Sequence, residues 1–177
     1  FNDTATTEIY TLYSSAASDV YKRQDINNKV FAFQGRAFGK EQPKYLTVKL
    51  DENKQKVYGL NTVNLQEDIH IVEGPIDSMF VKNCLAAAGA DLTLKVEPSN
   101  VTYIFDNEPR NKEIIKRMYY VIENDFFLVV WKYDMRHKDI NDMIISGMSI
   151  AEVQTIISKN TFAKLEALTK ISYYKKC

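Results

Sequence analysis

Two short apolar segments, DIHIVEG at residues 68–74 and VTYIFD at residues 101–106, decide the predicted fold. Each is a nearly continuous apolar run that ends in an acidic residue, and FFLVVWK at 126–132 is a third run of the same kind. Runs without an apolar–polar alternation are typical of parallel strands buried between helices, because a sheet with one wet face would alternate. The sequence therefore predicts an α/β domain with a mostly parallel sheet and helices on both faces.

The segments that follow these strands have a helical pattern. PIDSMFVKNCLAAAGA at 75–90 follows the first strand, and the amphipathic stretch KEIIKRMYYVIEN at 112–124 follows the second. In the first of these segments Met79 and Leu85 are expected on one buried helical face. Two shorter helices are predicted near the C-terminus, at the edge of the sheet. Their ranges and expected N-caps are 149–159 with Ser149, and 161–176 with Asn160 or Thr161.

The segment upstream of these units has a strand-like pattern. KVFAFQGRAFG at 29–39 and KYLTVKL at 44–50 are apolar and partly alternating, and the turn sequence DENK follows at 51–54. We expect a small β-rich part here. The predicted organisation is a leader at 1–24, the β-rich part at 25–66, the α/β domain at 67–145 and a helical extension at 146–177.

The first 24 residues, FNDTATTEIYTLYSSAASDVYKRQ, differ from the rest of the chain because they lack its apolar runs and any helical or strand period. They resemble the in-frame translation of a sequencing-library adapter and the adjoining transposon-end oligonucleotide. We therefore expect a disordered segment of foreign origin that contributes nothing to the fold. The alternative is a natural Ser/Thr-rich leader. On the foreign-origin interpretation the chain is a fragment whose parent protein extends upstream of Asp25.

The composition narrows the class of protein. The 23 basic and 23 acidic residues balance, which argues against a generally basic protein that coats nucleic acid but leaves room for a local basic patch. No apolar run approaches the ~20 residues of a membrane-spanning helix, so no membrane contact is expected. Two cysteines cannot form a disulfide framework or a four-ligand zinc site alone. We therefore expect an intracellular, cytoplasmic protein.

Acidic residues gather at the predicted carboxyl ends of the strands, where ligands bind in open α/β sheets. Glu73 ends the first strand and Asp77 follows in the next helix, whereas Asp106 and Glu108 follow the second strand. Hard cations such as Mg²⁺ take oxygen ligands, so these carboxylates could form a metal site. The alternatives are solvated loop acids and, for Asp77, a complement to the helix dipole. The segment KDIND at 138–142 could reach the same face or could simply cap a helix.

Short motifs in the acidic segments resemble those of a known protein family. Glu73-Gly74-Pro75-Ile76-Asp77 resembles the EGxxD motif of Toprim domains, which occur in bacterial-type primases, topoisomerases and some nucleases. Asp106-Asn107-Glu108 stands in place of the second Toprim motif, DxD, and the departure lengthens the last carboxylate arm. The segment at 138–142 is similar to the KDxND-type segment of phage primases.

The residues upstream favour a primase among the Toprim proteins. Phe33-Gln34-Gly35-Arg36 and Pro43-Lys44-Tyr45-Leu46 look like the FxGR and PKY motifs of bacterial-type primase catalytic cores, and Lys56-Val57-Tyr58-Gly59-Leu60 extends the similarity. The segment DNEPRN at 106–111 and the short helical tail look most like the primases of T-even-type bacteriophages.

The resemblance implies a set of metal ligands. Glu73, Asp106 and Glu108 would be catalytic and would hold Mg²⁺ or Mn²⁺, with Asp77 and Asp139 as supporting acids. Zinc would be bound only by an upstream domain of the parent protein.

The resemblance also implies substrate contacts and partners. Arg36, Lys44 and Lys138 would contact the incoming triphosphate or the template phosphates; alternatively, each is an ordinary surface charge. The partners would be single-stranded DNA, ribonucleoside triphosphates and a replicative helicase. The protein would act in the bacterial cytoplasm, that of the host if a phage encodes it.

The implied activity is synthesis of short RNA primers on single-stranded DNA by two-metal nucleotidyl transfer, in a groove between the β-rich part and the Toprim sheet. Two alternatives remain open. A Toprim nuclease would use the same metals to hydrolyse a phosphodiester, although the FxGR and PKY motifs argue against it. A non-enzymatic module that binds DNA or a helicase would have lost activity through the replacement at Glu108.

Overall fold

The computed structural model describes residues 18–37, 42, 45–54, 56–87 and 100–177. The chain divides into two compact units, which meet in sequence between Lys56 and Val57. This division lies upstream of the expected boundary at residues 66/67, because Val57 is buried in the core of the second unit and Tyr58 pairs with Ala86 of that unit's sheet. The segment expected to be a separate helical extension, 146–177, is part of the second unit.

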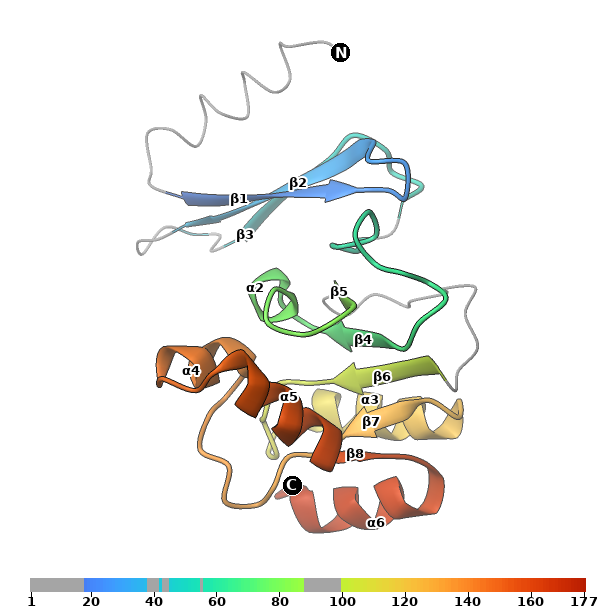
Figure 1. Cartoon of the computed structure of the whole chain (residues 1–177), viewed down its shortest axis with the longest axis vertical. Helices are drawn as coiled ribbons and strands as arrows, with labels where there is room; N and C mark the ends of the chain where they lie inside the picture. The colour runs from blue at the N-terminus through green and yellow to red at the C-terminus, as the bar shows by residue number, and fades with distance from the viewer. Residues whose placement is uncertain (1–17, 38–41, 43–44, 55, 88–99) are drawn as a thin grey trace. The chain divides into compact units, whose positions relative to one another are not determined.

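The first unit contains an antiparallel three-stranded sheet (Figure 1). Its strands, in spatial order, are β1 (Ser18–Gln24), β2 (Val30–Ala37) and β3 (Tyr45–Lys49). The motif residues Phe33 to Arg36 lie on the central strand, with Arg36 opposite Asp19 of β1 and Tyr45 of β3. The β-rich part is therefore present.

The expectation of a disordered leader over the whole of 1–24 is wrong for Ser18–Gln24, which form β1. Tyr21 is buried, and Arg23 is only 2% exposed and donates from Nη2 to Gln34 Oε1 at 2.8 Å. Pairing with β2 satisfies the backbone N–H and C=O groups of β1 whatever its side-chain pattern is. A strand therefore forms here although the sequence has no apolar alternation. Residues 1–17 lie outside the described residues, and their origin stays a prediction.

The second unit is built on a five-stranded, mostly parallel sheet. In spatial order its strands are β5 (Cys84–Ala86), β4 (Ile69–Val72), β6 (Val101–Ile104), β7 (Phe127–Val129) and β8 (Thr161–Phe162). The first four run parallel to one another, and β8 is an antiparallel edge strand. The predicted α/β class and mostly parallel sheet are confirmed.

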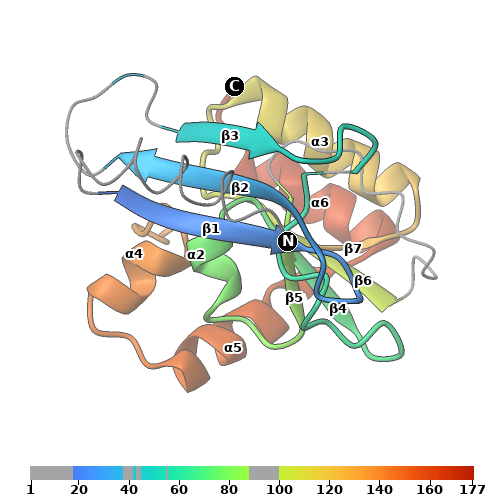
Figure 2. The same cartoon turned by 90° about the horizontal axis from the view of Figure 1, so that it is seen from above.

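Five described helices accompany this sheet. They are α2 (Pro75–Ser78), α3 (Lys112–Glu123), α4 (Ile140–Ile145), α5 (Ile150–Lys159) and α6 (Lys164–Tyr174). Figure 2 shows α3 and α6 on one side of the sheet and α2, α4 and α5 on the other. Ser149 caps α5 in a complete capping box, as expected, whereas α6 begins after Ala163 without a side-chain cap, so neither Asn160 nor Thr161 has that role.

The helix expected over 75–90 is mostly absent. Only one turn, α2, forms, and Leu85 lies in the buried strand β5, while Met79 is 54% exposed. The run Cys84–Ala86 is short and apolar, and periodicity alone cannot distinguish such a run from a buried helix. Residues 88–90 lie outside the described part of the chain.

The core of the second unit joins the sheet to its helices. Its fully buried side chains include Leu128 of β7, Met118 of α3, Met143 of α4 and Ile171 of α6. The buried Trp131 donates from its indole nitrogen to the backbone oxygen of Phe105 at 2.8 Å, which ties the segment after β7 to the segment after β6. Both segments lead into the candidate site. No helix in the described residues is long and apolar enough to cross a membrane.

Candidate active site

The carboxyl ends of β4 and β6 bring two of the predicted acidic residues together. Glu73 directly follows β4, and Asp106 lies two residues beyond β6, which pairs with β4 in parallel so that Val72 faces Ile104. The Asp106 backbone N–H donates to Glu73 Oε2 at 3.3 Å. Parallel pairing in register places the two strand ends at one edge, so this closeness follows from the topology.

Lys138 links Asp106 to Glu108. Its ammonium nitrogen lies 3.4 Å from Asp106 Oδ2 and 3.0 Å from Glu108 Oε1. Glu108 is also held by Asn111, whose amide donates to Oε2 at 2.7 Å. The Glu108 carboxylate is therefore fixed by a neighbouring cation and an amide.

The segment 135–138 is positioned by Asn107, the middle residue of the acidic motif. The Asn107 backbone N–H donates to the carbonyl of Lys138 at 2.6 Å, and its side-chain amide donates to the carbonyls of Met135 and His137 at 3.0 and 2.9 Å. This network brings Lys138 to the acidic residues. Asn107 therefore has a structural role in the site that its position between two acids did not suggest.

Asp77 connects α2 to α4, and Asp139 caps α4. Asp77 Oδ1 accepts from the Asn141 backbone N–H at 2.8 Å, and Asp139 is the N-cap of α4, with Oδ1 accepting from the Asp142 N–H at 2.7 Å. The capping alternative for Asp139 is thus confirmed. Asp77 therefore holds the α4 terminus next to α2, and Asp139 caps that terminus, both through bonds that need no metal.

The local electrostatics penalise negative charge at Asp106. Burial, followed by the charge of Glu73, raises the Asp106 pKa to about 6, although Lys138 opposes this rise. Burial, together with the charge of Asp139, also raises the pKa of Asp77 despite the Asn141 hydrogen bond. In contrast, hydrogen bonds from Asn111 and Lys138 lower the pKa of Glu108. An additional cation near Asp106 would relieve the repulsion there.

The carboxylates of Glu73, Asp106 and Glu108 are suitable ligands for a hard divalent cation. In this structure, however, each of them is bonded to a protein group. Arg117 donates from Nη1 to Glu73 Oε1 at 2.9 Å, and Lys138 occupies the space between Asp106 and Glu108. Within the described ranges no three acidic, histidine or cysteine side chains are arranged to hold a metal ion. The carboxylate oxygens are the ligand type that Mg²⁺ or Mn²⁺ prefers, and a cation would offset the burial and the Glu73 charge that raise the pKa of Asp106, so the fit rests on chemistry and charge.

The remaining predicted residues belong to the first unit. Arg36 is a half-buried residue of β2, and Lys44 lies outside the described residues. Arg117 was missed by sequence reasoning. The available signal was its place on the polar face of the helix that follows Asp106, but a helical periodicity does not indicate which residue an exposed arginine contacts.

One curated relative resembles nearly the whole chain. The DNA primase of Enterobacteria phage T4 is 34% identical over 187 residues, which cover 97% of this chain and 54% of that protein. The chain thus spans about half the length of the relative. The matched span includes most of residues 1–24. No protein-family model matches the sequence.

Solved structures with the same fold are primase cores. The Aquifex aeolicus primase, comprising its zinc-binding and RNA polymerase domains, matches with a TM-score of 0.63 and 18% identity, over 88% of this chain and 46% of that one. The E. coli primase catalytic core matches with a TM-score of 0.63 and 18% identity, over 86% and 55% of the two chains. A primase catalytic domain bound to single-stranded DNA matches with a TM-score of 0.59 and 15% identity, over 88% and 56%. The chain is therefore similar to DNA primases both in sequence and in fold.

Proposed function

We propose that this chain is catalytic core sequence of a DNA primase and contributes to template-directed synthesis of RNA primers on single-stranded DNA. The observation that carries the proposal is the similarity to the phage T4 primase along 97% of the chain. The convergence of Glu73, Asp106 and Glu108 on one side of the sheet supports it, because nucleotidyl transfer needs concentrated negative charge to retain divalent cations.

Glu73, Asp106 and Glu108 would hold Mg²⁺ or Mn²⁺, with Asp77 and Asp139 supporting them by orienting α2 and α4. When bound, the divalent ions would lower the pKa of the attacking 3′-hydroxyl and neutralise charge on the departing pyrophosphate. Of the chain's own groups, Asn111 keeps Glu108 aimed at the site, and Arg117 orients Glu73.

Lys138 has a second proposed task, contact with the triphosphate or template phosphates. Its side chain is 58% exposed, so its ammonium can meet a ligand while it remains near Asp106 and Glu108. Arg36 and Lys44 are proposed to contact phosphates as well. The proposed partners are single-stranded DNA, ribonucleoside triphosphates and a replicative helicase; the proposed compartment is the cytoplasm. A zinc-binding module is proposed for the parent protein, since the Aquifex relative contains one.

Primer extension tests this function directly. The purified chain is incubated with a short RNA annealed to single-stranded DNA, ribonucleoside triphosphates and Mg²⁺ or Mn²⁺, so that recognition of an initiation sequence is not required. We expect metal-dependent extension that is lost in Asp106→Asn. Metal-dependent cleavage of the DNA without any extension would contradict the proposal and support the Toprim nuclease. The absence of both reactions, together with retained DNA binding, would support the non-enzymatic module.

A further inference from the structure

Two adjoining hollows lie beside the acidic site, around Pro109. The larger has a volume of about 460 Å³ and the smaller about 150 Å³, and Pro109 and Lys176 line both. Arg110 lines the larger hollow, while Lys132 and Arg136 line the smaller one. The backbone N–H of Lys176 donates to the Pro109 carbonyl at 2.8 Å, which fixes the C-terminal residues against this loop.

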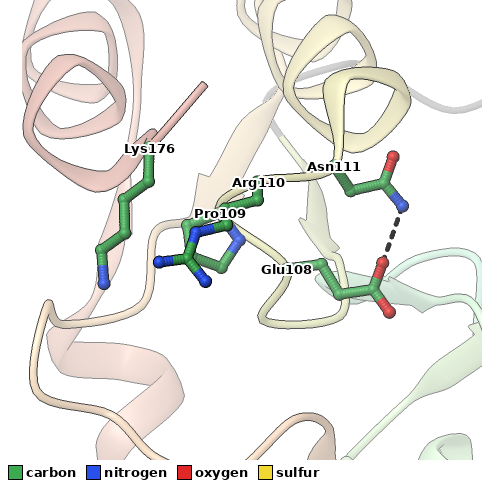
Figure 3. A pocket seen from close by; sticks show the side chains of 5 residues that line it. All are labelled: Glu108, Pro109, Arg110, Asn111 and Lys176. Carbon is green, nitrogen blue, oxygen red and sulfur yellow. Dashed lines mark hydrogen bonds between the residues drawn. The ribbon is translucent and has the colours of Figure 1, made fainter.

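The cations of these hollows lack carboxylate partners. Arg110, Lys132, Arg136 and Lys176 are all exposed, and none forms an ion pair with an acidic group of the described residues. The lining acid, Glu108, is already occupied by Asn111 and Lys138. Figure 3 shows the Glu108 carboxylate turned toward Asn111, on the far side of Pro109 from the Lys176 ammonium. The hollows are therefore lined by four exposed cations that form no ion pair within the described residues.

A buried hydroxyl supplies an independent indication of a ligand. Tyr174 lines the smaller hollow and is 4% exposed, and its hydroxyl has no hydrogen-bond partner of acceptable geometry among the described residues. The Glu108 backbone N–H lies near the hydroxyl oxygen, but as a donor it cannot accept the hydroxyl proton. An unmade hydrogen bond at a buried group costs free energy. An oxyanion in the hollow could accept this proton.

An exposed aromatic ring adds a surface suited to a base. Tyr133 lines the smaller hollow and is 76% exposed, and the Lys176 ammonium lies 4.2 Å from its ring centroid. Nucleic-acid-binding proteins commonly combine stacking rings of this kind with cations that contact the backbone. A free inorganic anion would use the cations but not the ring.

We propose that the two hollows form a binding site for the phosphates of a nucleotide or a single nucleic-acid strand. Arg110, Lys132, Arg136 and Lys176 contact the phosphate oxygens, Tyr174 donates its hydroxyl proton, and Tyr133 stacks on a base. This site borders the proposed metal site, since Glu108 lines the larger hollow, but none of its proposed contacts needs a divalent ion or a catalytic carboxylate. Its failure would therefore leave the proposed activity untouched.

Binding is measured with the full chain in EDTA, so that cations retained by the acidic residues do not contribute. The probes are sodium pyrophosphate, ATP and a labelled single-stranded DNA oligonucleotide. The double variant Arg110→Gln/Lys176→Gln should bind at least one of the two organic probes, ATP or DNA, about tenfold or more weakly, because it loses charge-assisted hydrogen bonds. The control Lys116→Gln/Lys159→Gln removes two exposed cations elsewhere in the same unit and should bind within about twofold of wild type.

The choice of probes distinguishes a free nucleotide from a nucleic-acid strand as the ligand. If a strand is the ligand, the dependence of log K on log salt should flatten by about 1.4 in the double variant, at roughly 0.7 per lost contact. If a nucleotide is the ligand, ATP binding should weaken and DNA binding should not. Loss of pyrophosphate binding alone would mean that no base is recognised and would overturn the proposal.

Tyr174→Phe separates a ligand contact from a structural role. It should weaken ATP or DNA binding severalfold without lowering the melting temperature, since it removes a buried hydroxyl that has no acceptor. The proposal is overturned if the wild-type chain binds neither ATP nor DNA in EDTA. Equal affinities of the wild type and the Arg110→Gln/Lys176→Gln variant would also overturn it, as would an equal loss in the control.

Discussion

The guanidinium of Arg117 lies 2.9 Å from Glu73 Oε1, so the helix α3, which follows β6, holds the carboxylate at the end of β4. Lys138 likewise forms ion pairs with the carboxylates of Asp106 and Glu108. Without these two cations, the carboxylates would repel one another in a partly buried site. A divalent cation that binds there would compete with Arg117 and Lys138 for the same oxygens.

Replacing Glu73 by Gln should separate catalysis from stability. The variant keeps the side-chain size but loses the charge that would retain a cation, so primer extension should fall by orders of magnitude. Loss of the Arg117 ion pair, in which Arg117 is 41% exposed, should cost less than about 1 kcal/mol, and relief of repulsion with Asp106 offsets part of it. Melting in EDTA should therefore be nearly unchanged. Glu123→Gln, an exposed carboxylate at the end of α3, is the control for both assays.

Wild-type extension by Glu73→Gln would show that this carboxylate has no part in the reaction. A drop of several kcal/mol in stability would instead show that the Arg117 pair is a main structural contact.

Asp106 should give the metal-free protein an unusual pH dependence. Its folded pKa of about 6 lies above the ordinary aspartate pKa of 3.8, so the folded state binds this proton more tightly than the unfolded state. The free energy of unfolding should therefore fall by roughly 1–3 kcal/mol as the pH rises from about 4 to 7. Asp106→Asn should remove this fall, and Asp134→Asn, an exposed carboxylate, should retain it. Urea unfolding in EDTA across this pH range makes the comparison, and identical slopes for all three proteins would refute the assignment.

The candidate site was predictable from the sequence where an acidic residue follows a buried strand. Glu73 and Asp106 follow buried apolar runs, and parallel pairing of those runs determines that their ends meet. Arg117 and Asn107 were not predictable, because their contacts span distant segments and depend on helix orientation and loop path. Asp77 was placed near the site, but its bond to the Asn141 backbone could not be read from spacing.

Gly74 is required for space rather than for an unusual backbone conformation. Its φ is −101°, which any residue can adopt, but a Cβ added there would lie 2.5 Å from Asp77 Oδ2. Gly74→Ala should therefore displace the Asp77 carboxylate, break its bond to Asn141 and reduce primer extension. Gly147, at φ +101° with open space around it, is the contrasting position. Gly147→Ala should cost about 1 kcal/mol of stability through backbone strain while extension continues. Equal effects of the two substitutions on extension would contradict this distinction.

The local sequence pattern also predicted the wrong secondary structure where the chain forms strands without a strand-like sequence. Cys84–Ala86 was predicted as helix because Leu85 shares an apolar helical face with Met79, yet it forms the edge strand β5 through parallel pairing with β4. Ser18–Gln24 has no apolar alternation, yet it pairs with β2 from Val30 to Ala37, with one irregularity at Phe31. In both cases partners distant in sequence decide the conformation, and a local window does not contain them.

The strand β1 allows a test of where the folded chain begins. Deleting residues 1–24 removes β1 and its buried Arg23, which leaves β2 and β3 as a two-stranded ribbon of marginal stability. Deleting only residues 1–17 retains β1. Amide hydrogen exchange of β2 should therefore rise sharply in the first deletion and remain as in the full chain in the second. If β2 stayed protected after removal of residues 1–24, β1 would be dispensable and the whole leader could be foreign to the fold. If the shorter deletion already exposed β2, residues 1–17 would contribute to the first unit, contrary to the prediction that their sequence pattern supports.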